Sequence, residues 1–298
     1  MFEGPLAASA YEVLGVEPTV DDEALRRAYR LRLRQTHPDT GGDAALFIRV
    51  QRAWEHIGTP QLREAYDRGR SGARWDAGAA SAPRHGTRPR TTTFGVAGAW
   101  RRERYLTMLA EHLGAPVADP YDPAVVRSAP WEVRRMLADA LAEEATATAI
   151  DELGIGFTAW HGVEAGSAAV LDHIVLAPSG LYGLVSEDFG DSVRFRQGEV
   201  IGGAVGGETP VADLLLRMRW IARAARVRFG GAILILPDED LDHAATPLGT
   251  VRGVPVVVVR RSALRMLLRT GVPGARPLGM TEAFDVRTRL KSVRVRTP

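Results

Sequence analysis

The feature that most constrains this fold is a five-residue corner, Thr36-His37-Pro38-Asp39-Thr40, between two segments with helical periodicity. Pro38 fixes its own φ and disfavours helical geometry at His37, so the preceding helix must end there. The short connection makes the two helices antiparallel neighbours. The sequence therefore predicts a helical hairpin with an exposed imidazole and an exposed carboxylate, His37 and Asp39, at its tip.

The first helix of this hairpin has an apolar face and a basic face. Asp21 or Asp22 can cap it, and Leu25, Ala28 and Tyr29 recur at helical spacing. The remaining surface carries four arginines: Arg26, Arg27, Arg30 and Arg34. A charge run of this kind is usually a solvated helix face, and the alternative is a docking surface for an acidic partner.

The second helix supplies the opposing apolar stripe through Phe47, Val50, Trp54 and Ile57, and Pro60 opens a further short helix. Tyr29 and Trp54 could be taken for a ligand-stacking pair. At this spacing, core packing or contact with a partner is the ordinary interpretation.

Residues 8–70 resemble a J domain, the module by which DnaJ-type co-chaperones engage DnaK-type ATPase chaperones. The family pattern occurs in order, as Tyr11-Glu12-Val13-Leu14-Gly15, Ala28-Tyr29, His37-Pro38-Asp39, Phe47, Ala53-Trp54 and Tyr66-Asp67. One departure is Arg32, where the family usually has leucine.

This resemblance implies an all-α domain and a DnaK-type partner, whose acidic groove would take the basic helix face and the corner. The implied contact residues are Arg26, Arg27, Tyr29, Arg30, Arg34, His37, Pro38 and Asp39. In such a contact, His37 and Asp39 are not acid–base catalysts. They favour the hydrolysis-competent state of the partner, and the charge steering is sensitive to salt.

Residues 71–93 shift to Gly, Ala, Ser, Thr, Pro and Arg without an apolar period, which predicts a flexible linker. Its arginines could touch nucleic acid or an acidic protein, although a solvated tether is the ordinary interpretation.

Residues 94–298 begin with a helical extension and continue as an α/β domain with a central mixed sheet. Helices are expected at 99–113, 131–153, 210–227 and 262–268, with Thr209 capping the third. Strands are expected at 157–163, 170–176, 181–185, 193–195, 232–236 and 254–259.

Part of this domain resembles the nuclease-related domain, a branch of the restriction-endonuclease-like fold. The resemblance rests on Glu143, on Asp172 within Leu171-Asp172-His173-Ile174-Val175, and on the hairpin Pro178-Ser179-Gly180-Leu181-Tyr182. Active relatives carry a Glu-x-Lys pair on the next strand, where the carboxylates bind a metal and the lysine assists the attacking water. Those two positions are Val185 and Glu187 here, which implies a degenerate site without metal. An unorthodox site built from Asp172, Glu187 and Asp188 is the alternative.

Other signals are weaker. The glycine-rich segment 202–207 lacks the ending of a phosphate loop and is expected to be a hairpin tip. His161 and His173 lie on expected strands, where sheet packing is commoner than ligation. The basic segment 287–296 could contact RNA, DNA or anionic lipid, or form a surface strand or a frayed tail.

Composition narrows the class of protein. The 298 residues are 45% hydrophobic, which is enough for about two cores. The longest apolar runs fall far short of the ~20 residues of a membrane helix. Cysteine is absent and the N-terminus has no export pattern, so we expect a cytoplasmic protein without a membrane partner. The net charge of +2 is too small to indicate nucleic acid by itself.

The sequence thus predicts a non-enzymatic co-chaperone without a cofactor. Its J domain would stimulate a DnaK-type chaperone, and its C-terminal domain would recruit an unidentified client. The alternative is a nucleic-acid-binding or nuclease-related protein that recruits DnaK through its J domain. A third possibility is a J domain that serves only as a scaffold.

Overall fold

The computed structural model describes residues 4–6, 8–38, 41–72, 90–166 and 169–296. They form two compact units. The first contains the described residues up to Gly72 together with Asp119–Ser128, and the second contains the other described residues from Arg90 onward. Each unit has its own apolar core.

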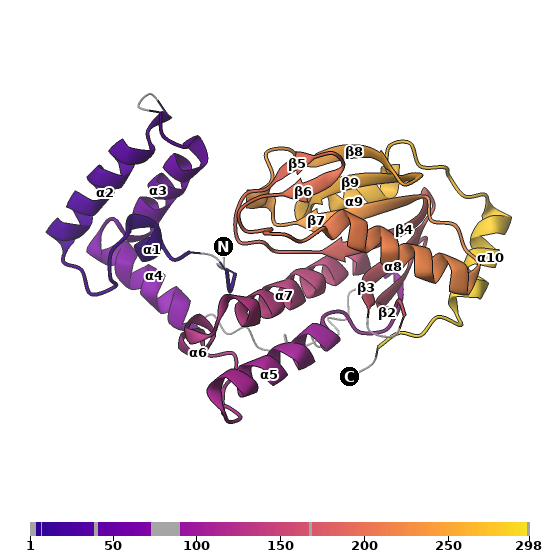
Figure 1. Cartoon of the computed structure of the whole chain (residues 1–298), viewed down its shortest axis with the longest axis horizontal. Coiled ribbons are helices and arrows are strands. Elements are labelled where there is room, and N and C mark those ends of the chain that lie inside the picture. Colours follow the sequence, from indigo (N-terminus) through magenta and orange to yellow (C-terminus); the bar gives the residue numbers. More distant parts are fainter. Residues whose placement is uncertain (1–3, 7, 39–40, 73–89, 167–168, 297–298) are drawn as a thin grey trace. The chain divides into compact units, whose positions relative to one another are not determined.

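The first unit is helical. Its helices are α1 (Ala10–Leu14), α2 (Asp22–Thr36), α3 (Ala44–Ile57), α4 (Pro60–Gly72) and α6 (Pro123–Ser128). The helices α2 and α3 lie side by side and are joined at the His37 corner, as the sequence predicts (Figure 1). Of the two candidate caps it is Asp21 that acts, because its carboxylate accepts the Ala24 N–H at 2.7 Å.

The core of this unit lies between the helices α1, α2 and α3. Leu14, Leu25 and Ile57 are almost fully buried there, and the rings of Tyr29 and Trp54 stack at 4.4 Å beside them. The stacked pair therefore belongs to the packing between α2 and α3. Leu33 joins this core, whereas Arg32 lies over Gly15, so the arginine at the leucine position adapts by covering a glycine.

The second unit is built on a mixed seven-stranded sheet with the order β1-β2-β3-β4-β7-β9-β8 (Figure 1). The central pairs β4–β7 and β7–β9 are parallel, and β2–β3, β3–β4 and β8–β9 are antiparallel. The strands are β1 (Thr92–Phe94), β2 (Thr158–Glu164), β3 (Val170–Ala177), β4 (Gly180–Ser186), β7 (Gly231–Leu236), β8 (Ala245–Val251) and β9 (Val254–Arg260). A separate hairpin pairs β5 (Arg194–Arg196) with β6 (Glu199–Ile201).

Helices cover both faces of the sheet. One face buries residues of α8 (Pro210–Ala225) and α10 (Met280–Leu290), and the other buries residues of α7 (Trp131–Asp151) and α9 (Leu264–Thr270). Successive residues of β7 point to opposite faces of the sheet. Leu234 packs in the core under α8 and α10, whereas Ile233 and Ile235 pack in the core under α7 and α9. Helix α5 (Ala99–Leu113) packs against α7.

Two boundaries differ from those predicted from composition. Residues 92–94 form β1, which pairs in parallel with β2, so the end of the expected 71–93 linker is part of the sheet. Residues 119–128 belong to the first unit and not to the α/β domain. Helix α6 was not predicted, because the prolines of this stretch indicated an irregular connection. Asp122 caps its first turn by accepting the Ala124 N–H at 2.7 Å. The first two positions of the expected linker, 71 and 72, are the end of α4, and residues 73–89 lie outside the described residues.

The start of α8 differs too. Thr209 does not cap this helix with its side chain. Instead, the carboxylate of Glu199 on β6 accepts the N–H groups of Val211 at 2.8 Å and Ala212 at 3.0 Å. The glycines at 202–207 lie between β6 and α8, because the hairpin turn between β5 and β6 falls at Gln197 and Gly198.

The C-terminal basic segment begins as the end of α10 and continues beside the sheet. Val295 bridges to Val163, and the Glu164 N–H donates to the carbonyl of Arg294 at 3.0 Å. This part of the chain therefore lies along the edge of β2. None of the helices in the described ranges has both the length and the apolar character needed to cross a membrane.

Candidate functional site

The His37 corner is held by backbone contacts. His37 has the extended geometry (φ −65°, ψ 128°) that Pro38 requires, and the hydroxyl of buried Thr36 donates to the Arg32 carbonyl at 2.9 Å. The Gly42 N–H donates to the His37 carbonyl at 3.0 Å. A Cβ at Gly42 would lie 2.3 Å from the Thr36 backbone, so only glycine permits this approach.

The imidazole of His37 is oriented by α3. It meets the ring of Phe47 edge to face, with ring centroids 5.0 Å apart, and it remains partly exposed. Pro38 is exposed, and Asp39, which the sequence assigns to the same contact surface, lies outside the described residues. The corner thus presents His37 from a preset position next to α2.

The arginines of α2 lie on its exposed surface. Arg26, Arg27, Arg30 and Arg34 are all exposed, and Tyr29 between them is half-buried against Trp54. Arg27 forms an ion pair with Glu23 one turn earlier at 2.7 Å, so part of its charge is already matched. Arg26 and Arg30, which lie one turn apart, are exposed on the same face of α2, and Arg30 is the nearer of the two to the corner.

A second polar constellation lies inside the α/β unit, around the guanidinium of Arg101 on α5. This side chain is 5% exposed. It lies 3.0 Å from Asp139, 3.3 Å from Glu143 and 3.1 Å from Asp172, and Glu187 is 3.9 Å away. A buried cation therefore stands at the centre of four carboxylates that come from α7, β3 and the end of β4.

Arg135 extends the same network on α7. Its Nε donates to Asp139 at 2.9 Å and one Nη donates to Glu187 at 2.6 Å. The guanidinium also lies over the ring of Phe189, 4.2 Å from the centroid. Since Arg135, Asp139 and Glu143 are four residues apart, α7 turns one polar stripe toward the sheet.

Gly98 brings the two helices close enough for this network. It precedes α5 with φ +73°, and a Cβ there would lie 2.8 Å from the side chain of Glu144 on α7. Arg102, the residue after Arg101, forms two hydrogen bonds to the Glu144 carboxylate, from Nε at 2.5 Å and from one Nη at 2.7 Å. The close approach of α5 to α7 thus inserts Arg101 between the carboxylates.

Burial and charge set the protonation of this cluster. Burial raises the pKa of Asp139 to about 8, and it raises the pKa values of Glu143 and Asp172. Burial acts in the same direction on Glu187, but Arg101 and Arg135 outweigh it and lower the pKa of Glu187. Two buried cations therefore hold Glu187 ionised, while Glu143, which has no aligned hydrogen bond from Arg101 Nε, favours its neutral form.

The arrangement does not fit a divalent metal. The guanidinium of Arg101 fills the position between the carboxylates, and Val185 is buried in the core on the α8 face. Among the described residues, no group of three or more His, Asp or Glu side chains is arranged to hold a metal ion. The Glu187 carboxylate pairs with the two arginines and is not free to ligate.

The two sheet histidines contact each other. Their Nδ1 atoms lie 2.8 Å apart, and burial lowers the pKa of His161 to about 4 and that of His173 well below its ordinary value. Both rings are therefore neutral at pH 7. This agrees with the prediction that they serve sheet packing.

The comparisons with known proteins concern the first unit. The family model of the DnaJ domain matches residues 9–67. Relatives include DnaJ protein homolog 2 from Allium porrum (44% identical over 57 residues, 19% of this chain and 14% of that protein). Another is Chaperone protein DnaJ from Thermosynechococcus vestitus (42% over 66 residues, 21% of this chain and 18% of that protein).

Residues 9–67 are a J domain. The chain spans less than a fifth of the length of these relatives, and no solved structure matches it. A third relative, the tetratricopeptide repeat and J domain-containing co-chaperone DNJ1 from Mycosarcoma maydis, is 39% identical over 59 residues, 20% of this chain and 10% of that protein. The matches lie in the J domain, so they do not assign the α/β unit to a family.

Sequence reasoning found part of each site. In the J domain it named the corner and the arginine face of α2. In the α/β unit it named Glu143, Asp172 and Glu187, which the structure brings together, but it missed Arg101, Arg135 and Asp139. An arginine on a helix is normally solvated, so only the run Arg135, Asp139 and Glu143 on one helical face signals a buried polar stripe.

Proposed function

We propose that this chain is a co-chaperone whose J domain binds a DnaK-type chaperone and stimulates its ATP hydrolysis. The observation that carries the proposal is the exposed arginine face of α2 beside a corner that holds His37 in a fixed position. The arginines would dock on an acidic groove, and His37 with Asp39 would favour the hydrolysis-competent state of the partner. No proton transfer by His37 is required. A cytoplasmic location is part of the same proposal.

The test is single-turnover ATP hydrolysis by a DnaK-type chaperone with the full chain and with variants. We expect stimulation by the wild-type chain, none by His37→Gln, and a loss at moderate salt for Arg26→Ala/Arg30→Ala that exceeds the loss at high salt. Arg52→Ala on α3 is the matched control, because Arg52 is exposed in the same domain but lies on another helix. Equal stimulation by wild type and His37→Gln would contradict the proposal.

We propose further that the α/β unit recruits a client or partner and is not an enzyme, and that the Arg101 cluster is a nuclease-like site that has lost catalysis. The insertion of Arg101 between Asp139, Glu143 and Asp172 supports this, because a fixed cation occupies the position that a metal would need. The residues at the two positions of the Glu-x-Lys pair support the proposal as well. Val185 has no atom that can bind a metal, and the negative charge of Glu187 is opposite to that of the lysine that assists the attacking water.

Two measurements test this second proposal. Plasmid DNA incubated with the chain and Mg²⁺ or Mn²⁺ should stay intact, and cleavage that disappears in Asp172→Ala would refute the proposal. If Arg101 stands in for a cation, Arg101→Ala should lower the stability of the α/β unit by about 3–5 kcal/mol. Mn²⁺ should then raise the unfolding midpoint of Arg101→Ala and leave that of the wild-type chain unchanged.

A further inference from the structure

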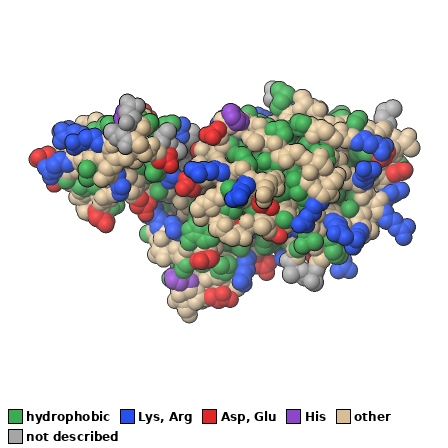
Figure 2. Space-filling view, turned by 45° about the horizontal axis from the view of Figure 1, so that its top comes forward, with side chains coloured by type: hydrophobic (Ala, Val, Ile, Leu, Met, Phe, Trp, Pro, Cys, Tyr) green, Lys and Arg blue, Asp and Glu red, His purple; other side chains and the backbone are tan. Residues whose placement is uncertain are grey.

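Basic side chains gather on one surface of the α/β unit. From residue 214 to residue 237 the chain has five arginines and no acidic residue, and from 286 to 298 it has four arginines and Lys291, again without an acidic residue. Figure 2 shows Lys and Arg side chains gathered at the right-hand end of the view, where α8 and α10 lie in Figure 1. Eight of these cations are exposed: Arg219, Arg223, Arg226, Arg228, Arg287, Arg289, Lys291 and Arg294.

Direct contacts bring the two basic segments together. A guanidinium nitrogen of Arg289 on α10 donates to the Arg226 carbonyl at the end of α8, at 2.7 Å. The carbonyl of Arg294 accepts the N–H of Glu164 at the end of β2, and Trp220 on α8 packs over Gly166 just beyond that strand. The end of α8, the end of α10 and the C-terminal segment therefore form one surface around Trp220, which we call the basic surface.

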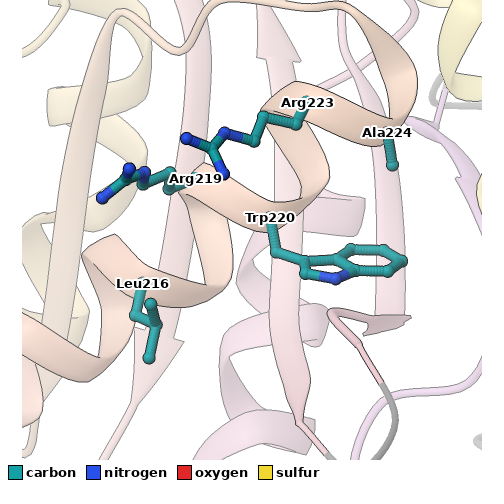
Figure 3. Close-up of a pocket in the computed structure, with 5 residues that line it drawn as sticks. All are labelled: Leu216, Arg219, Trp220, Arg223 and Ala224. Carbon is teal, nitrogen blue, oxygen red and sulfur yellow. The ribbon is translucent and has the colours of Figure 1, made fainter.

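This surface contains an apolar hollow. Its lining residues are Leu216, Arg219, Trp220, Arg223 and Ala224, and its volume is about 480 Å³. Figure 3 shows Arg219, Trp220 and Arg223 extending from the same stretch of α8. Leu216 is 61% exposed and Trp220 is 48% exposed, a large fraction for an indole and a leucine that lie one turn apart.

We propose that the basic surface binds single-stranded nucleic acid, with a base stacked on Trp220 and phosphates paired with Arg219 and Arg223. Stacking on an aromatic ring inside a positively charged groove is how proteins bind single strands without sequence preference. Arginine suits this role because its planar fork pairs with phosphate and also stacks on bases. A duplex would use the arginines but would hide its bases from Trp220.

Charge complementarity supports this occupant. The acidic residues that these elements add are Asp213 at the start of α8, Glu282 and Asp285 on α10 and Glu164 at the end of β2. The eight exposed cations outnumber these four residues twofold, and Glu282 is already paired with Arg276 at 3.1 Å. The side of α8 opposite the hollow is buried in the core through Leu214, Met218 and Ile221, so the helix cannot turn a wider apolar face toward a lipid bilayer.

The experiment is fluorescence anisotropy of a labelled 20-nucleotide single strand of mixed sequence, titrated with the full chain from 50 to 300 mM NaCl. Binding should weaken steeply with salt. Arg219→Ala/Arg223→Ala should reduce the slope of log K against log salt by about 1.4. Trp220→Leu should weaken binding about tenfold at unchanged slope, whereas Trp220→Phe should retain most of the affinity.

Arg269→Ala is the matched control, because Arg269 is exposed on α9, on the other face of the sheet. Binding that Arg269→Ala weakens as much as the double variant, or equal affinity for a duplex or for polyglutamate, would overturn the proposal. Absence of binding at 50 mM salt would do the same. Unfolding midpoints check that the Trp220 variants are folded. Stimulation of the DnaK-type ATPase should be unchanged in every one of these variants, so this test and that of the co-chaperone role can fail separately.

Discussion

At the scale of single residues, the buried cluster separates two carboxylates that the sequence places in one degenerate site. Glu187 pairs with Arg135 at 2.6 Å and lies 3.9 Å from Arg101. Both arginines lower its pKa against the effect of burial. Glu143 is completely buried, and burial raises its pKa well above the ordinary value. The first group therefore stabilises the fold as an anion, and the second as a neutral acid.

Conservative substitutions should reveal this difference. Glu187→Gln removes a charge that faces two buried cations and should lower the free energy of unfolding of the α/β unit by about 3 kcal/mol. Glu143→Gln keeps the shape and charge of a protonated glutamate and should cost less than about 1 kcal/mol. Urea unfolding at pH 7 measures both. A larger loss for Glu143→Gln than for Glu187→Gln would contradict the assignment of charge.

At the scale of elements, the start of α8 shows how a distant strand can replace a local cap. The sequence pattern Thr209-Pro210 predicts a side-chain cap, but Glu199 on β6 takes that role by accepting two backbone N–H groups. A carboxylate is also favoured there by the positive end of the helix dipole. Glu199 thereby ties the β5–β6 hairpin to the helix that carries the basic surface.

Two alanine substitutions distinguish these caps. Glu199→Ala should destabilise the α/β unit by about 1–2 kcal/mol, because it leaves the N–H groups of Val211 and Ala212 without their acceptor. Thr209→Ala should change the free energy of unfolding by less than about 0.5 kcal/mol. Thermal unfolding followed by circular dichroism measures both variants. If Thr209→Ala were the more damaging of the two, the local cap would be the one that matters.

Elements with a strong apolar period were predictable. The helix expected at 99–113 is α5 without change, and the strands expected at 170–176 and 232–236 are β3 and β7 within a residue at either end. The strand β8 was missed because Pro247 and Gly249 interrupt its sequence, so apolar residues do not recur at every second position. The short β1 was missed because its Thr-Thr-Phe sequence continues the composition of the preceding segment.

The candidate sites divide in the same way. The His37 corner is local in sequence, so a proline and the flanking helices suffice to predict it. The position of Arg101 depends on α5 packing against α7, which in turn requires the positive φ and missing side chain of Gly98. No local sequence pattern predicts how closely two helices pack. The resemblance to a nuclease-related domain identified Glu143, Asp172 and Glu187, but neither Asp139 nor the arginine between the carboxylates.

At the scale of the whole molecule, the two units differ in their buried charge, so pH should act on them differently. In the J domain, burial raises the pKa of Tyr11 to about 12, and backbone N–H groups lower that of Asp21. Neither group titrates between pH 6.5 and 8. The stability of the J domain should therefore stay constant across this range.

The α/β unit contains groups of both signs. Burial lowers the pKa of His161 to about 4 and also lowers that of His173, so the unfolded chain binds more protons below about pH 6.5. This contribution to stability rises with pH and levels off about one pH unit above the ordinary pKa of histidine. Burial raises the pKa values of Asp139 and Asp240 from 3.8 to about 8. Between those values the folded state binds more protons, so this contribution falls as pH rises.

Above pH 6.5 the fall from the carboxylates outweighs the small remaining rise from the histidines, so we expect the free energy of unfolding of the α/β unit to fall by about 2 kcal/mol from pH 6.5 to pH 8. Hydrogen exchange of the β7 amides reports this unit, and exchange of the α3 amides reports the J domain. Asp240→Asn should remove part of the fall, because Asp240 Oδ2 is buried without a hydrogen-bond partner and an amide imitates its neutral form. A flat profile for β7, or a fall in α3 that matches it, would mean that the buried carboxylates do not take up protons in the folded state.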